Sequence, residues 1–142
     1  MRVVFLALFF LCPAPAHADP GPAAHTVTHA KDAATQVAPS GKAKITHLAL
    51  GKNAFLGRLA LAPGAKVPLH RDATEEYIHV LSGGGTITVD GTKHVLTAGS
   101  TVYMPANAEV TYTNGDAPTV AIQVFAGPGP AAKYGKWPAS AK

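Results

Sequence analysis

The chain has 142 residues, with 12 Lys and Arg against 8 Asp and Glu, and a formal net charge of +4 at neutral pH. This length suits one domain and leaves no room for two of ordinary size. The basic residues are scattered singly, without the concentrated basic stripe that nucleic-acid binding needs, so we exclude a nucleic-acid partner.

Residues 1–18 have the parts of a cleavable signal peptide. Arg2 supplies the positive start, residues 3–11 form an unbroken apolar run, and a small-x-small triplet ends at Ala18. The apolar run is too short to span a bilayer core, which needs about 20 residues in a helix. We therefore expect a periplasmic or secreted protein that begins at Asp19 and has no membrane attachment after cleavage.

The single cysteine, Cys12, lies inside this signal. The mature chain would then have no thiol, which excludes disulfides, a cysteine nucleophile and thiolate metal ligands. Residues 19–43, which follow the signal, are rich in Ala, Pro, Thr, Ser and Lys and offer little to bury. We expect them to form a flexible N-terminal segment, or an arm that docks on another surface.

Residues 44–126 consist of short runs rich in β-branched and aromatic residues, separated by turn residues such as Asp90-Gly91, a strong hairpin signal. With no helical periodicity of useful length, this pattern predicts an all-β antiparallel sandwich or barrel. The tail, residues 127–142, carries Tyr134 and Trp137, which we expect to pack on the barrel or on a second subunit. The predicted strands are residues 45–50, 55–61, 75–81, 86–89, 94–96, 100–104, 109–113 and 119–125.

Two sets of residues stand at definite intervals among the predicted strands. The first is Gly64, His70, Asp72, Glu76 and Gly83, and the second is Gly99, Pro105 and Asn114. These are the intervals of the two sequence motifs of the cupin family. The chain thus resembles a small single-domain type-2 cupin over roughly residues 45–126. The resemblance implies a double-stranded β-helix, which is a small jelly-roll barrel, and a homodimer.

The departures from the motifs concern the metal site. Metal-binding cupins use three His and one Glu, whereas the matching positions here are His70, Asp72, Glu76 and Val110, and Asn107 replaces a motif glycine. One imidazole and two carboxylates would suit a divalent ion such as Mn²⁺, and less well Fe²⁺ or Zn²⁺. Without a metal, two close carboxylates would raise the pKa of one of them unless a cation pairs with it.

Successive side chains of a strand point to opposite faces, which indicates which of the remaining candidates point into the barrel. If Glu76 faces the barrel interior, Ile78 shares its face and His79 points outward. Val110 and Tyr112 share one face of their strand, and the resemblance implies that this face points inward, because Val110 stands at the family's ligand position. We predict that Ile78, Val110 and Tyr112 line a ligand pocket. A core tyrosine with a satisfied hydroxyl is an equal interpretation of the last of these.

We expect different roles for two further histidines. His47 lies on an early strand and is expected to be structural. The direction of His94 is left open by the sequence, and it is the one residue that could restore a second imidazole.

Three functions follow as hypotheses, because the cupin fold alone does not select a chemistry. The favoured one is an exported protein that binds a small organic ligand in its barrel beside a degenerate metal site. The second is a metal-dependent enzyme of oxygenase or isomerase type. The third is a metal-free enzyme in which Glu76 or Asp72 acts as acid or base.

Overall fold

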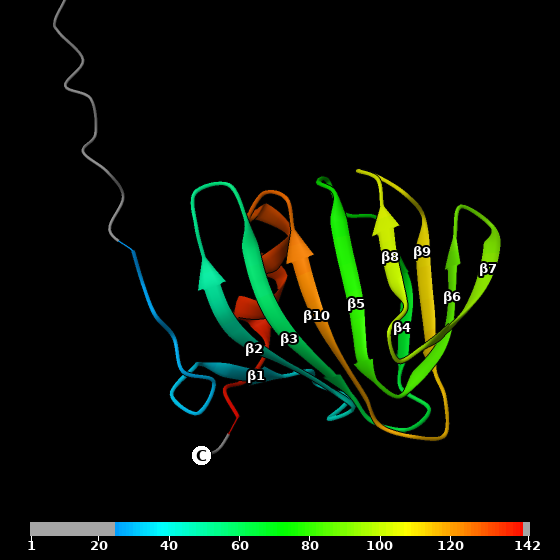
Figure 1. Cartoon of the computed structure of the whole chain (residues 1–142), viewed down its shortest axis with the longest axis horizontal. Helices are drawn as coiled ribbons and strands as arrows, with labels where there is room; N and C mark the ends of the chain where they lie inside the picture. The colour runs from blue at the N-terminus through cyan, green and yellow to red at the C-terminus, as the bar shows by residue number, and fades with distance from the viewer. Residues whose placement is uncertain (1–24, 141–142) are drawn as a thin grey trace, which may run out of the picture.

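The computed structural model describes residues 25–140, so the predicted signal peptide lies outside the described residues. Within them the fold consists of two antiparallel sheets, as Figure 1 shows, and apolar side chains from both sheets pack between them. This confirms the predicted all-β class and the double-stranded β-helix. No helix among residues 25–140 is long and apolar enough to cross a membrane.

The two sheets differ in size. The larger has the strand order β1-β2-β3-β10-β5-β8, with β1 (Thr35–Val37), β2 (Ala43–Leu50), β3 (Phe55–Leu61), β10 (Thr119–Phe125), β5 (Glu76–Ser82) and β8 (Thr101–Met104). The smaller has the order β4-β9-β6-β7, with β4 (Lys66–His70), β9 (Val110–Asn114), β6 (Gly84–Val89) and β7 (Thr92–Thr97). Every strand predicted from the sequence is present.

Alternating burial explains why these residues form a two-sheet barrel. In β10, every second residue from Thr119 to Phe125 is buried, as expected for a strand with one face on the core. The β6–β7 hairpin turns at Asp90 and Gly91, which have φ of 46° and 80°, because a two-residue turn of this kind needs two left-handed residues. Asn107, which replaces a motif glycine, also has a left-handed φ of 63°, a conformation that Asn tolerates better than most residues.

Strand β4 was not predicted, and its sequence explains why. Pro68 lies in its middle, and proline lacks the N–H that a central strand needs. In the structure β4 is the outer strand of the smaller sheet and pairs with β9 alone, and its register is irregular between Val67 and His70. Proline is tolerated in edge strands and at such irregularities.

The segment expected to be flexible, residues 19–43, contributes to the larger sheet. Thr35–Val37 form β1, which pairs with β2. The Thr35 and Thr46 hydroxyl oxygens are 2.9 Å apart, and Gln36 Oε1 is 2.6 Å from His47 Nε2. Residues 35–37 are therefore a paired strand, as the alternative expectation of a docking arm allows, and polar cross-strand contacts there replace the apolar burial that the sequence lacks.

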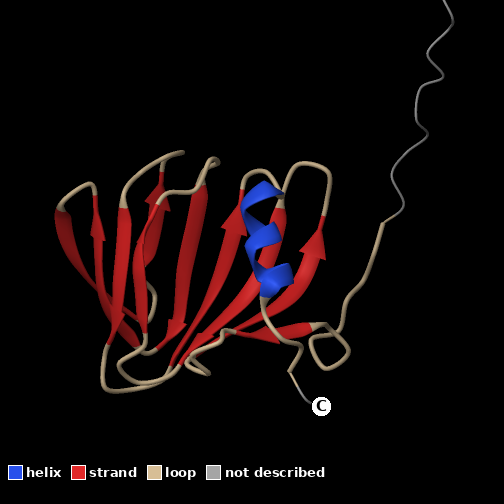
Figure 2. Ribbon diagram, turned by 180° about the vertical axis from the view of Figure 1, so that it is seen from behind, coloured by secondary structure: helices blue, strands red, loops and turns tan. Residues whose placement is uncertain are grey.

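The tail contains an eight-residue 3₁₀ helix, η1 (Gly129–Lys136), which the strand-only prediction did not include. Figure 2 shows this helix against the larger sheet, where Ala131 and Tyr134 join a buried cluster with Ile45, Phe55 and Phe125 from β2, β3 and β10. Trp137 packs at the edge of the same cluster, 4.9 Å from Tyr134 between ring centres. The tail thus forms one wall of the interior.

Candidate ligand pocket and acidic cluster

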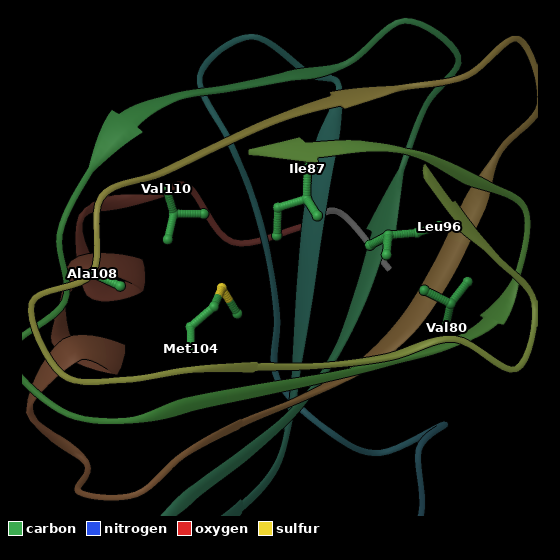
Figure 3. Close-up of a cluster of buried hydrophobic side chains, with 6 residues drawn as sticks. All are labelled: Val80, Ile87, Leu96, Met104, Ala108 and Val110. Atoms are coloured by element: carbon green, nitrogen blue, oxygen red, sulfur yellow. The ribbon is translucent and has the colours of Figure 1, made fainter. Parts of the chain in front are cut away.

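A cavity of about 670 Å³ lies between the two sheets and η1. Its walls are mostly apolar and come from both sheets, and Figure 3 shows five of the wall side chains pointing into the interior: Val80, Ile87, Leu96, Met104 and Val110. The volume is in the range of pockets that enclose small organic molecules.

The three residues predicted to line a ligand pocket all line this cavity. Ile78 lies on β5, and Val110 and Tyr112 lie on β9. The Tyr112 hydroxyl donates to Asn114 Oδ1 at 2.9 Å, and burial raises the pKa of this tyrosine. Its ring therefore forms a wall, while its hydroxyl is already satisfied by a protein partner.

One end of the cavity is polar, because His70, Asp72 and Glu76 converge there. Each offers a ligand atom, and these atoms lie within 4.8 Å of one another. His70 ends β4, Glu76 begins β5, and Asp72 lies in the loop between them. Val110 pairs directly with His70 across the smaller sheet, so the position of the second-motif histidine is apolar.

We call His70, Asp72 and Glu76 the acidic cluster. A neighbouring carbonyl group determines the tautomer of its histidine. His70 Nδ1 is 2.9 Å from the carbonyl oxygen of Pro68, which can only accept a hydrogen bond. The Nδ1 atom therefore carries the proton in the neutral ring. Nε2 keeps its lone pair and lies 3.7 Å from Asp72 Oδ2.

Glu76 is held by a chain of buried hydrogen bonds. Gln123 Nε2 on β10 donates to Glu76 Oε1 at 2.6 Å, and the Tyr134 hydroxyl on η1 donates to Gln123 Oε1 at 2.7 Å. Burial raises the pKa of Tyr134, which keeps this hydroxyl protonated and able to donate. The chain links the acidic cluster to the tail.

A cation from the tail completes the cluster. Lys133 Nζ lies 2.8 Å from Asp72 Oδ2, and it is also 4.9 Å from the centre of the Phe125 ring. Both contacts stabilise the ammonium group, since Asp72 pairs its charge and the Phe125 ring presents an aromatic face to it. The cluster therefore contains two carboxylates, one imidazole and one ammonium group.

The pKa of Glu76 is raised above its ordinary value of 4.5. Burial is the main cause, and Asp72 adds to it, whereas the Gln123 hydrogen bond, Lys133 and His70 act in the opposite direction. Since the pKa is higher in the folded chain, the folded state binds more protons than the unfolded state between the two values. Stability should consequently fall as the pH rises from 4.5 through the folded pKa.

Replacing Glu76 with Gln should remove that pH dependence. Gln can still accept the hydrogen bond from Gln123, and it carries no charge to bury. We expect the melting temperature of Glu76→Gln to exceed that of the wild type at pH 8, and the difference to shrink toward pH 4.5. Circular dichroism melts in the presence of a chelator measure this. An unchanged slope with pH in the variant would show that Glu76 is not its source.

The donor set taken alone would suit a divalent ion, but its surroundings do not fit a resident one. The ammonium of Lys133 already pairs with Asp72, and a second cation beside it would be repelled. The fourth ligand position is the apolar Val110. The three donors that the sequence predicted are therefore together, with an ammonium group already paired to one oxygen of Asp72.

Three histidines on the described strands, His47, His79 and His94, lie outside the acidic cluster. His47 is half-buried against Phe55, and burial lowers its pKa. His79 is exposed and 2.8 Å from the Thr101 hydroxyl. His94 is exposed on β7 and is absent from the group of converging ligand atoms, so it restores no second imidazole.

Sequence reasoning missed Gln123 and Lys133 as members of the site. Gln123 occupies an inward position on a predicted strand, where a polar residue among apolar ones is a detectable signal. For Lys133 the sequence offers no such signal, because only the path of η1 brings its side chain to the cluster.

Comparisons with known proteins agree with this architecture. Residues 57–125 match the family model for the cupin domain. The structure superposes on an RmlC-like cupin of Shewanella frigidimarina with a TM-score of 0.67 and 18% identity, covering 73% of this chain and 92% of the other. KdgF from Halomonas gives a TM-score of 0.67 at 15% identity, covering 73% of this chain and 94% of that one.

One curated relative is similar in sequence. The dimethylsulfoniopropionate lyase DddW of Ruegeria pomeroyi is 34% identical over 58 residues, which are 41% of this chain. The match spans 38% of the length of that enzyme.

Proposed function

Since the chain belongs to the cupin family, we propose that it binds a small organic molecule in the cavity of its barrel. The observation that carries this proposal is a cavity of about 670 Å³ with apolar walls and one polar end. An apolar body would lie against Ile78, Val110 and Tyr112, and a polar group would face Asp72 and Lys133. A few polar groups at one end of an apolar pocket fix a ligand's orientation.

A thermal-shift screen tests this proposal. The panel should contain carboxylic acids, alcohols and amides on matched apolar skeletons. A ligand that binds only the folded state stabilises it by about 2.7 kcal/mol at 100 times its Kd, so a hit should raise the melting temperature by several degrees in a dose-dependent way. A panel in which no compound shifts the melting temperature at millimolar concentration would count against a ligand pocket of this chemistry.

A metal-dependent enzyme is the second candidate, favoured by the convergence of His70, Asp72 and Glu76. The name of the relative DddW makes a lyase reaction the first to examine. In this function a divalent ion such as Mn²⁺, Fe²⁺ or Zn²⁺ would have to bind beside Lys133 or displace it from Asp72 Oδ2.

Two measurements distinguish this candidate from ligand binding alone. Metal analysis of the tag-free protein should find about one equivalent of a divalent ion if the enzyme hypothesis is right. Incubation with dimethylsulfoniopropionate, followed by NMR, should then show loss of that compound. A substoichiometric metal content together with unchanged dimethylsulfoniopropionate would exclude this candidate.

A further inference from the structure

The acidic cluster needs a cation. Asp72 and Glu76 belong to a group whose ligand atoms lie within 4.8 Å of one another at one end of the cavity. Glu76 is buried and Asp72 is largely shielded from solvent. Two carboxylates so placed are costly to keep ionised unless a positive charge pairs with them.

Lys133 supplies this charge at a fixed position. Its Nζ lies 2.8 Å from Asp72 Oδ2, although the two residues are 61 positions apart in the chain. Contacts on either side of the lysine hold η1 in place. Ala131 and Tyr134 are buried in the aromatic cluster, and the Tyr134 hydroxyl donates to Gln123, the partner of Glu76.

The environment of the ammonium group also differs from that of an ordinary surface lysine. The Nζ atom lies 4.9 Å from the centre of the Phe125 ring and 5.6 Å from that of Tyr134. Aromatic faces stabilise a cation that has lost part of its water. By contrast Lys136, at the end of the same helix, is exposed.

The opposite side of the cluster also lacks a metal ligand. Val110, paired with His70 across the smaller sheet, offers no lone pair to an ion. A metal ion would thus have fewer ligands than a four-ligand site provides, and it would face a neighbouring positive charge. The missing fourth ligand and the nearby ammonium group therefore both disfavour a bound metal ion.

From these contacts we propose that Lys133 is the resident cation of this cupin and takes the place that a metal ion has in metal-binding members of the family. The ammonium neutralises Asp72 and links the tail to the acidic cluster. It also disfavours divalent ions, because it already occupies Asp72 Oδ2 and its charge repels a second cation. This inference goes beyond the proposed ligand pocket and stands or fails separately from it.

Calorimetric titration with Mn²⁺ and Zn²⁺ tests the inference in chelator-treated, tag-free protein. The wild type is compared with Lys133→Met, which removes the ammonium and keeps most of the apolar stem. Lys136→Met is the matched control, because it makes the same substitution and charge change on the same helix. Lys133→Gln serves as a second variant if the methionine protein fails to fold.

We expect weak binding by the wild type and by Lys136→Met, and binding at least about tenfold tighter by the Lys133 variants, since the unit positive charge beside Asp72 is removed. Micromolar or tighter binding by the wild type would overturn the inference, and so would Lys133 variants that bind no tighter than wild type. Either result would leave the ligand pocket untouched, because the screen with organic compounds tests that pocket independently.

Discussion

Phe55→Ala is expected to destabilise the protein by about 3–5 kcal/mol, the usual cost of removing a buried phenylalanine. The Phe55 side chain is fully buried and lies between β2, β10 and η1, with its ring centre 6.1 Å from that of Phe125 and 6.0 Å from that of Tyr134. Since domains of this size are stable by about 5–15 kcal/mol, the loss would be a large fraction of the total.

Urea unfolding followed by tryptophan fluorescence measures this loss. Trp137 is the only tryptophan in the chain and packs against Tyr134, so it reports on the cluster that Phe55 supports. Leu50→Ala is the control, because Leu50 pairs with Phe55 across β2 and β3 but is 69% exposed. It should change stability by no more than about 0.5 kcal/mol. A Phe55→Ala protein as stable as this control would refute the described packing of the tail.

Ala121→Phe is expected to weaken ligand binding at least tenfold, which corresponds to about 1.4 kcal/mol. Ala121 is buried at the centre of β10 and its side chain faces the cavity. A phenyl ring there would occupy space that the ligand needs, while the cavity of about 670 Å³ leaves room for the ring itself. The fold should therefore survive a substitution that blocks the pocket.

Isothermal titration with the best compound from the thermal-shift screen measures the effect. Ile122→Phe is the matched control, because the next residue on the same strand faces away from the cavity. The control should bind like wild type. Equal affinity of the Ala121 variant and this control would place the ligand outside the barrel.

Much of the fold could be predicted from local patterns. The alternation of buried and exposed residues in strands, and turn residues such as Asp90-Gly91, are patterns of a few consecutive residues. They can therefore be recognised in a single sequence. The convergence of His70, Asp72 and Glu76 was expected from the motif spacing, since the three positions lie in or beside one short loop between β4 and β5. Strand parity, together with the family resemblance, placed Ile78, Val110 and Tyr112 on the inner faces.

What the sequence did not disclose depends on tertiary contacts. β1 is too short and polar to be recognised before its partner β2 is in place, and β4 is interrupted by Pro68. Lys133 looked like an ordinary solvated lysine, because nothing in its neighbourhood in the chain fixes its direction. Only the packing of Tyr134 against Phe55 and Phe125 turns it toward Asp72.

The function of the pocket is tested most directly by a crystal structure of the protein with the tightest compound from the screen. We predict electron density between the two sheets, with the apolar body against Val110 and Tyr112 and a polar group within hydrogen-bonding distance of Asp72 or Lys133. A compound bound on the outer face of either sheet, with the cavity filled only by water, would contradict the account.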